Sequence, residues 1–341
     1  MRVTQEKRLR NFWYCVMPVS KLSEGPKPFE LLGEKLALWL DETGNPHAVR
    51  DRCLHRSAAL SSGRVENGNI VCPYHGWAYS GSGACALIPQ GQGKAPGSYA
   101  VRSYHCAARY GHVWVALEDP VFGIPEIPEG SDPAYRQIDE FDEEWLCAPL
   151  RLMENAFDNA HLAFVHQNTI GSGDPAPAEN TIETRDDGFI TRVEAVVGNP
   201  AHMRGAIGID AEKTLRSTAN QFFLPFFRVG RITYPNGLVN IHCTAATPMG
   251  EGRTQRLQWV LRNDTEADVP QESVIAFDRE VSDEDQWILE TTDPDVPLDN
   301  SEGIEFSMKS DQPGLLMRRM LRDSLNRVGA PTETAETKEA Q

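Results

Sequence analysis

Two short segments with the same mixture of metal-binding residues constrain this chain more than any other feature. Cys53 and His55 stand in the sequence CLH, and Cys72 and His75 stand in CPYH after sixteen intervening residues. Thiolate and imidazole groups suit either a structural zinc ion or an iron–sulfur cluster. A zinc finger pairs Cys with Cys and His with His, whereas each loop here offers one of each. This order favours a [2Fe–2S] cluster in which the cysteines hold one iron and the histidines the other.

The sequence around these loops predicts a small all-β domain. Short stretches of strand-forming residues at 31–40, 47–53, 69–80 and 105–118 alternate with Gly, Asn and Pro turn signals. Residues 119–133 contain four prolines and two glycines. Such a composition excludes a regular element, so we expect the boundary between two domains there.

A second group of metal-binding residues follows the boundary. Residues 151–166 have an apolar pattern of helical period and include Asp158, His161 and His166. His161 and His166 are five residues apart, which separates them by about 140° around an ideal helix. A π-type turn, or an end of the helix near Phe164, would bring both imidazoles to one ion. Two histidines and one carboxylate leave positions open on Fe(II) for O₂ beside a substrate.

The carboxylate has to come from another part of the chain. A helix predicted at 272–292 carries Asp283, Glu284 and Asp285 just before the apolar residues 287–289. Any of the three could supply the third ligand. The simpler alternative is that they form a solvated helix face.

The remaining sequence predicts an α+β domain with an antiparallel sheet. We expect strands at 189–197, 219–229, 237–248 and 256–263, and a C-terminal helix at 314–328. The loop 171–180 is either a substrate lid or a plain solvent loop. Residues 328–341 are expected to form a flexible tail.

The only local indication of a substrate pocket is an aromatic strand. Asn220, Phe222 and Leu224 could form an apolar pocket wall, although the same side chains could equally belong to the sheet core. The other histidines lack metal-ligand spacing and are expected to be structural or surface residues, with His202 and His242 as weak pocket candidates: His47, His105, His112, His202 and His242.

Composition excludes several classes of function. The chain of 341 residues carries a formal net charge of −16, which would repel nucleic acid and anionic membrane surfaces. No apolar run approaches the roughly 20 residues of a membrane span. Seven cysteines are too few and odd for a secreted disulfide scaffold, so a cytoplasmic location is expected. There is no flavin or NAD fingerprint, so electrons from NAD(P)H would have to arrive through a separate reductase.

The segment CLHRSAALSSGRVENGNIVCPYHGWAYSGSGAC resembles the Rieske domain of the Rieske non-haem iron oxygenases, and ENAFDNAHLAFVH resembles their iron-binding helix. The resemblance covers nearly the whole chain. It implies a Rieske [2Fe–2S] domain over 1–125 and a helix-grip-like catalytic domain with mononuclear Fe(II) over 126–327. It favours Asp285 over Asp283 as the carboxylate ligand.

The resemblance also implies roles for two neighbours of the histidines and an assembly. Asp158 matches the aspartate that connects His161 to His75 of an adjacent subunit, and Asn155 matches its neighbouring asparagine. Electrons would then cross between subunits of a homotrimer. The chain is most similar to the demethylase and monooxygenase branch, which includes methylxanthine N-demethylases and the vanillate and dicamba O-demethylases.

The expected function is that of a terminal oxygenase. It would use O₂ and electrons from a ferredoxin or a flavin/iron–sulfur reductase to hydroxylate a small organic substrate, with N- or O-demethylation favoured. The alternatives are a C–H hydroxylase or stepwise methyl oxidase of a polycyclic substrate, a Rieske electron-transfer protein, and a zinc-stabilised binding module.

Overall fold

The computed structural model describes residues 1–91, 97–171, 176, 179–299 and 303–328. Its N-terminal part contains two antiparallel sheets. The larger has the strand order β1-β10-β9-β4-β3-β2, and the smaller has the order β5-β6-β7-β8. Their bounds are β1 Tyr14–Pro18, β2 Lys27–Leu31, β3 Glu34–Leu40, β4 Pro46–Arg50, β5 Arg64–Glu66, β6 Asn69–Val71, β7 Ala78–Tyr79, β8 Cys85–Leu87, β9 Ser103–Arg109 and β10 His112–Ala116.

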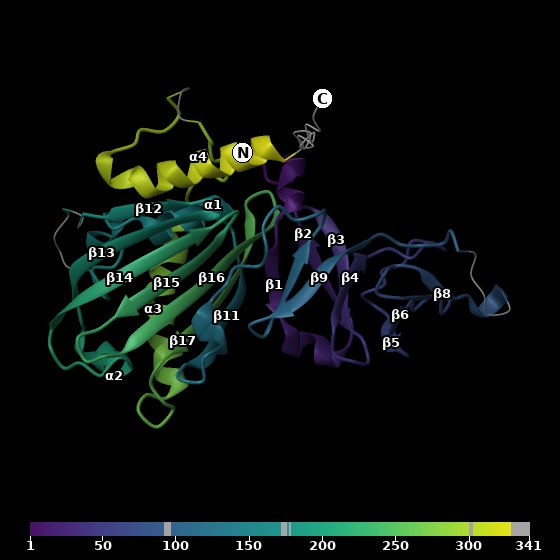
Figure 1. Ribbon diagram of the computed structural model, residues 1–341, viewed down its shortest axis with the longest axis horizontal. Coiled ribbons are helices and arrows are strands. Elements are labelled where there is room, and N and C mark those ends of the chain that lie inside the picture. Colours follow the sequence, from purple (N-terminus) through teal and green to yellow (C-terminus); the bar gives the residue numbers. More distant parts are fainter. Residues whose placement is uncertain (92–96, 172–175, 177–178, 300–302, 329–341) are drawn as a thin grey trace, which may run out of the picture.

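The C-terminal part is a seven-stranded antiparallel sheet with helices, in the order β11-β17-β16-β15-β14-β13-β12. The strands are β11 Arg136–Trp145, β12 Thr181–Arg185, β13 Gly188–Gly198, β14 Lys213–Phe223, β15 Phe227–Thr233, β16 Val239–Gly250 and β17 Arg253–Arg262. The helices are α1 Pro149–Phe157, α2 Arg204–Ile207, α3 Gln271–Leu289 and α4 Gln312–Arg327. Figure 1 shows α3 lying against one face of the sheet and α4 crossing its upper edge. The predicted α+β class and the sheet-and-helix catalytic domain are therefore confirmed.

The central strands of the large sheet have two chemically different faces. Phe223, Phe227 and Trp259 lie on one face and pack with Trp114 of β10, which joins the sheet to the N-terminal part. The alternate residues point to the α3 side and are largely polar, among them Asn220, Arg228 and the residues of β16 and β17 next to them. Side chains alternate along a strand, so the same strands bury one face and furnish a cavity with the other.

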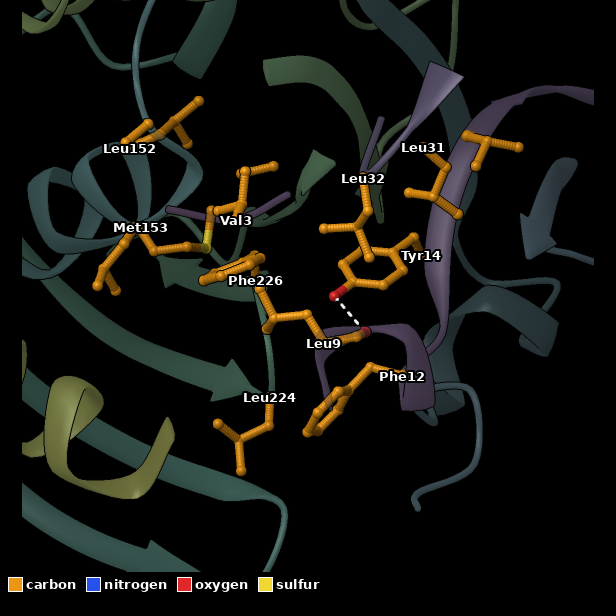
Figure 2. Close-up of a cluster of buried hydrophobic side chains, with 14 of the residues drawn as sticks. Val3, Leu9, Phe12, Tyr14, Leu31, Leu32, Leu152, Met153, Leu224 and Phe226 are labelled. Atoms are coloured by element: carbon orange, nitrogen blue, oxygen red, sulfur yellow. Dashed lines mark hydrogen bonds between the residues drawn. The ribbon is translucent and has the colours of Figure 1, made fainter. Parts of the chain in front are cut away.

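The two parts share one continuous hydrophobic core (Figure 2). Leu9, Phe12 and Tyr14 near the N-terminus meet Met153 of α1 and Phe226 of the turn between β14 and β15. The Tyr14 hydroxyl donates to the Leu9 carbonyl oxygen at 2.8 Å, which satisfies a polar group in this apolar setting. The shared core fixes the position of α1 relative to the N-terminal sheet.

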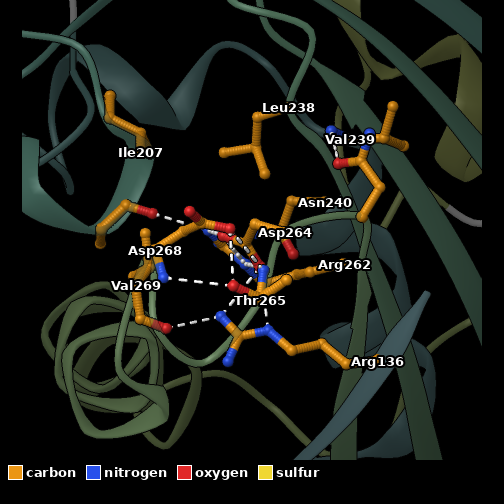
Figure 3. Close-up of polar contacts among 12 residues, drawn as sticks. Arg136, Ile207, Leu238, Val239, Asn240, Arg262, Asp264, Thr265, Asp268 and Val269 are labelled. Carbon is orange, nitrogen blue, oxygen red and sulfur yellow. Dashed lines mark hydrogen bonds and ion pairs between the residues drawn. The ribbon is translucent and has the colours of Figure 1, made fainter. Parts of the chain in front are cut away.

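A buried polar network holds the start of α3 against the sheet (Figure 3). Arg262 of β17 is almost fully buried and pairs with Asp264, which also pairs with Arg136 of β11 at 2.8 Å. Arg136 Nη2 donates to the carbonyl oxygen of Val269, in the loop that leads into α3, at 2.6 Å. Asp264 supplies the anionic partner that buried Arg262 needs. Through Arg136 and Val269, the same network connects the sheet to the helix that carries the predicted carboxylate.

Sequence and structure differ most at the helix predicted for 151–166. Helix α1 ends at Phe157, and Asp158 adopts an extended conformation (φ −88°, ψ 125°). One 3₁₀ turn, His161–Ala163, follows. The break therefore comes before the first histidine rather than near Phe164. Sequence analysis also did not predict β1, β11 and β12; β11 is rich in acidic residues, which strands ordinarily disfavour.

The region expected to separate the domains contains only one short turn of 3₁₀ helix, Pro128–Ser131, between β10 and β11. Most of the predicted loop 171–180, residues 172–175 and 177–178, and the tail from residue 329 onward lie outside the described residues. In the described part of the chain, no helix is long and apolar enough to cross a membrane.

Candidate metal centres and active-site cavity

The first predicted group of ligands lies in two loops, one between β4 and β5 and the other between β6 and β7. Cys53 and Cys72 are each 1% exposed and belong to one hydrophobic cluster, while the rings of His55 and His75 lie 4.3 Å apart. The loop after β6 is closed by a hydrogen bond from the Gly76 amide to the Cys72 carbonyl oxygen. Gly76 has φ +72°, a conformation that glycine adopts at little cost. The fold therefore brings all four residues to two neighbouring loop tips.

The donor arrangement fits a two-iron cluster better than a single ion. A tetrahedral zinc ion with ligands at 2.0–2.3 Å would hold its donor atoms within roughly 4 Å of one another. No three of Cys53, His55, Cys72 and His75 bring ligand atoms within 4.8 Å of one another. His75 Nδ1 is buried without a hydrogen-bond partner, as expected for a nitrogen reserved for a metal.

Two neighbours support the cluster loops. The Tyr79 hydroxyl lies 3.3 Å from Cys53 Sγ and accepts a hydrogen bond from the Leu54 amide at 3.2 Å. The indole of Trp77 stacks on the His55 ring at 5.0 Å. Hydrogen bonds to a sulfur ligand and packing on a histidine ligand both influence the potential of such a cluster.

The second predicted group converges beside α1 and α3. His161 Nε2 lies 3.1 Å from His166 Nε2, and Asp285 Oδ1 lies 3.6 and 3.1 Å from these two nitrogens. These three side chains form one of only two metal-compatible sets among the described residues. The break at Asp158 makes this possible, because it releases both histidines from the 3.6-residue period of α1.

The environment of this set favours a cation. Burial favours the neutral imidazole of His161, but the carboxylates of Asp158 and Asp285 outweigh this effect and raise its pKa to about 9. His161 Nδ1 is buried and has no hydrogen-bond partner. Two imidazoles and one carboxylate are the donors that non-haem Fe(II) uses, so the residues fit the predicted ion.

Neighbouring side chains orient the ligands. Asn155 Nδ2 donates to Asp285 Oδ1 at 2.8 Å. Glu284 Oε2 accepts from His166 Nδ1 at 2.8 Å and from Thr169 Oγ1 at 2.6 Å. A carboxylate that accepts from the far nitrogen of an imidazole fixes its tautomer and leaves the other nitrogen free for a metal.

The three acidic residues of α3 therefore have different surroundings. Asp285 points to the histidines, Glu284 orients His166, and Asp283 lies 61% exposed beside Arg279. The orienting role of Glu284 was missed from sequence, although its position next to Asp285 could have indicated it.

Asp158 connects the metal set with the protein surface. Its Oδ1 accepts from the Ala160 amide at 2.7 Å, and its Oδ2 lies 3.6 Å from His161 Nδ1. Burial raises the pKa of the Asp158 carboxyl, but the nearby His161 imidazole and the hydrogen bond from the Ala160 amide outweigh burial and lower this pKa. With 36% of its side chain exposed, Asp158 contacts both the histidine and the exterior.

A cavity of about 170 Å³ opens from the metal set between α3 and the sheet. Of the three residues proposed for a pocket wall, Asn220 lines this cavity, whereas Phe222 and Leu224 do not. Phe222 packs against Phe157 and Phe189, and Leu224 lies in the core shared by the two parts of the chain (Figure 2). Phe222 shares the strand face of Asn220 but lies beyond the cavity, so β14 contributes only its polar residues Arg216, Thr218 and Asn220 to the lining.

The five remaining histidines lie outside both groups. His242 of β16 lines the cavity near Asp278, whereas His202 pairs with Glu280 on the surface. His112 stacks on Trp259, and the others pair with aspartates: His47 with Asp41 and His105 with Asp119. Sequence analysis missed Arg228 and Arg216 as cavity residues, because nothing in a strand sequence tells which face meets a helix.

Comparison with known proteins gives consistent results along the chain. Residues 12–105 match the Rieske [2Fe–2S] domain, and residues 145–327 match the vanillate O-demethylase oxygenase C-terminal domain. The methylxanthine N1-demethylase of Pseudomonas putida is 30% identical over 332 residues, which cover 94% of this chain and 90% of that protein. The dicamba O-demethylase oxygenase component of Stenotrophomonas maltophilia is 36% identical over 163 residues, 47% of this chain and 48% of that protein.

Solved structures of oxygenases have the same fold along nearly the whole chain. The P. putida CBB5 methylxanthine demethylase NdmA with caffeine has a TM-score of 0.83 and 26% identity, with 95% of this chain and 93% of that one covered. Dicamba monooxygenase shares the fold with a TM-score of 0.80 at 23% identity, over 94% and 98% of the two chains. With a Rieske domain, a matching catalytic domain and a 30% identical relative along nearly its whole length, this chain belongs to the Rieske non-haem iron oxygenases. It is the O₂-dependent terminal oxygenase of a system with a Rieske cluster, a mononuclear iron and a separate electron donor.

Proposed function

We propose that this oxygenase removes a methyl group from nitrogen or oxygen of a small organic substrate by hydroxylating that methyl group. The observation that carries the proposal is that the His161, His166 and Asp285 set lines a cavity of about 170 Å³. The relatives named N- and O-demethylases support the choice of reaction. A hydroxylated N- or O-methyl group loses formaldehyde.

In this proposal His161, His166 and Asp285 hold Fe(II), and Cys53, His55, Cys72 and His75 hold the [2Fe–2S] cluster. The bound metals supply reductive activation of O₂ with electrons that arrive one at a time. Asn155 holds the Asp285 carboxylate by its 2.8 Å hydrogen bond, and Glu284 holds His166 in one tautomer. These residues keep the ligands in place.

We further propose that the functional unit is a homotrimer, in which Asp158 connects His161 to His75 of an adjacent subunit. Within one chain, the small sheet with the cluster loops and the helix α1 lie at separate parts of the molecule (Figure 1). Asp158 shares a surface groove with Phe306, which is 94% exposed, and Tyr74 beside His75 is 63% exposed. Exposed aromatic residues at both places support a contact between subunits, and a head-to-tail contact that closes makes a ring.

We also propose two domains followed by a tail, a class of electron donor and a cytoplasmic location for the protein. The Rieske domain would span 1–125, the catalytic domain 126–327 and the tail 328–341. The electron donor would be a ferredoxin or a flavin/iron–sulfur reductase that draws on NAD(P)H. All seven cysteines are free, which supports a reducing cytoplasm.

The first experiment combines metal and sulfide analysis with EPR of the dithionite-reduced protein, before and after anaerobic addition of Fe(II). We expect about three irons per chain and a Rieske-type signal. Methylated aromatic and heterocyclic compounds are then screened for formaldehyde release with a reductase. Only two irons after Fe(II) addition, or hydroxylated products that keep their methyl groups, would contradict the proposal.

A further inference from the structure

The sheet side of the cavity carries two arginines that the proposed chemistry at the metal does not use. Arg216 of β14 and Arg228 of β15 both line the cavity that also contains His161 and Asp285. Arg216, Thr218 and Asn220 alternate along β14, so they share the face that α3 covers.

Arg228 is held in a fixed orientation. Its Nε and Nη2 both donate to Asn220 Oδ1, at 3.1 and 2.9 Å. The guanidinium lies over Gly230, where an added Cβ would come within 2.4 Å of Arg228 Nη2 and 2.6 Å of Asn220 Oδ1. Gly230 is paired with Asn220 in the sheet, so the missing side chain provides the space that the guanidinium fills.

The charge of this fixed guanidinium is not neutralised. Among the residues that the structure describes, neither Arg216 nor Arg228 has a carboxylate oxygen within 4.0 Å. Arg256, in the same cavity wall, is paired with Glu143 at 3.2 Å. Burial lowers the pKa of Arg228 to about 10, so it remains a cation at neutral pH. A half-buried cation without an anionic partner is costly, which indicates that a ligand supplies the anion.

The acidic residues of the same wall do not compensate for it. Asp278 lies 3.7 Å from His242 Nδ1, and Glu140 belongs to the same set of ligand-type side chains. Burial and the nearby Asp278 raise the pKa of the Glu140 carboxyl. Burial lowers the pKa of His242 to about 4, so this imidazole is neutral. Among the described residues, neither Glu140 nor Asp278 has a carboxylate oxygen within 4.0 Å of the Arg216 or Arg228 guanidinium.

We propose that Arg228, aligned by Asn220 and assisted by Arg216, binds an oxyanion of the substrate, so that the substrate is a small methylated organic acid. The inference rests on the proposed function, because it takes the cavity at the metal set as the substrate site. A planar guanidinium fork recognises a carboxylate through paired hydrogen bonds, and a sulfonate offers the same chemistry. Binding the acid group at Arg228 would leave another part of the molecule toward the metal set.

The test measures binding without turnover. Isothermal titration calorimetry of the anaerobic protein loaded with both metals compares benzoate, benzenesulfonate and neutral benzamide. We expect benzoate or benzenesulfonate to bind at least about 30-fold more tightly than benzamide, and Arg228→Met to reduce that binding by about 30-fold or more. Which of the two anions binds more tightly distinguishes a carboxylate from a sulfonate substrate. Arg228→Lys keeps the charge without the fork and should recover only part of the loss.

Arg192→Met is the matched control, because Arg192 lies on β13 with half of its side chain exposed, in a pair with Glu183. It should leave binding unchanged. Three results would each overturn the inference: benzamide binds as tightly as the acids, neither acid binds detectably at about 10 mM, or Arg228→Met leaves acid binding unchanged. A dissociation constant of about 10 mM corresponds to a binding free energy of roughly −3 kcal/mol. Acid binding that Arg228→Met does not change would indicate that the acid group binds to the iron itself. Because these probes carry no methyl group, failed formaldehyde release with intact Arg228-dependent binding would refute only demethylation.

Discussion

Glu284 provides the sharpest test of how this chain holds its mononuclear iron. Its Oε2 accepts from His166 Nδ1 and Thr169 Oγ1, and His166 is only 1% exposed. Glu284→Ala leaves a buried imidazole N–H without an acceptor, at a cost of roughly 1–3 kcal/mol. Loss of a carboxylate that orients a histidine ligand ordinarily weakens metal binding about 10–100-fold, or roughly 1.4–2.7 kcal/mol. The two estimates of the cost agree, so we expect Glu284→Ala to lower the affinity for Fe(II) by about 10–100-fold.

The assay is a chelator competition for Fe(II) on protein that keeps its [2Fe–2S] cluster but has lost the mononuclear iron. Glu284→Gln keeps one oxygen acceptor and should lose less affinity than Glu284→Ala. Asp283→Ala is the control, because Asp283 is the adjacent acidic residue but pairs with Arg279 at the surface. Wild-type affinity in Glu284→Ala, or an equal loss in Asp283→Ala, would refute the reasoning that separates these neighbours.

Three further predictions concern other parts of the molecule. Asp158→Ala should leave both metals bound by EPR and metal analysis but abolish product formation, since it removes the proposed connection to the adjacent subunit; substantial coupled activity would contradict this. Gly230→Ala should displace the Arg228 guanidinium and weaken benzoate binding by calorimetry without changing iron content, because its Cβ would come within 2.4 Å of Arg228 Nη2; unchanged binding would show that the wall can adjust. Asp264→Asn should lower stability by roughly 3–5 kcal/mol, because it leaves buried Arg262 without its anion. Burial opposes ionisation of Asp264, but Arg262 and Arg136 outweigh it and lower its pKa. This contribution is therefore present at every pH above about 4, where the unfolded carboxyl ionises, and is lost only at lower pH. Thermal unfolding should show the same gap between variant and wild type from pH 8 to pH 5, and a gap that closes within that range would contradict the assignment.

The types of the candidate ligands and their grouping along the chain can be recognised without a structure. The Cys–His pairs of the two short loops are close in the chain, so local turns suffice to present each pair together. Likewise, the strand and helix patterns of residues 256–263, 272–292 and 314–328 appear as β17, α3 and α4, because hydrophobic periodicity reflects which side of an element is buried.

How distant residues combine depends on the packing of the folded chain. Phe157 at the end of α1 packs in the shared core just before the break at Asp158, and the choice of Asp285 among three adjacent acids depends on how α3 lies on the sheet. Phe222 and Asn220 are two residues apart on β14, yet one packs with Phe157 and the other holds Arg228. Periodicity tells which residues share a face, but what that face meets is set by segments far away in the chain. The unpaired charge of Arg228 is therefore visible only once all the walls of the cavity are in place.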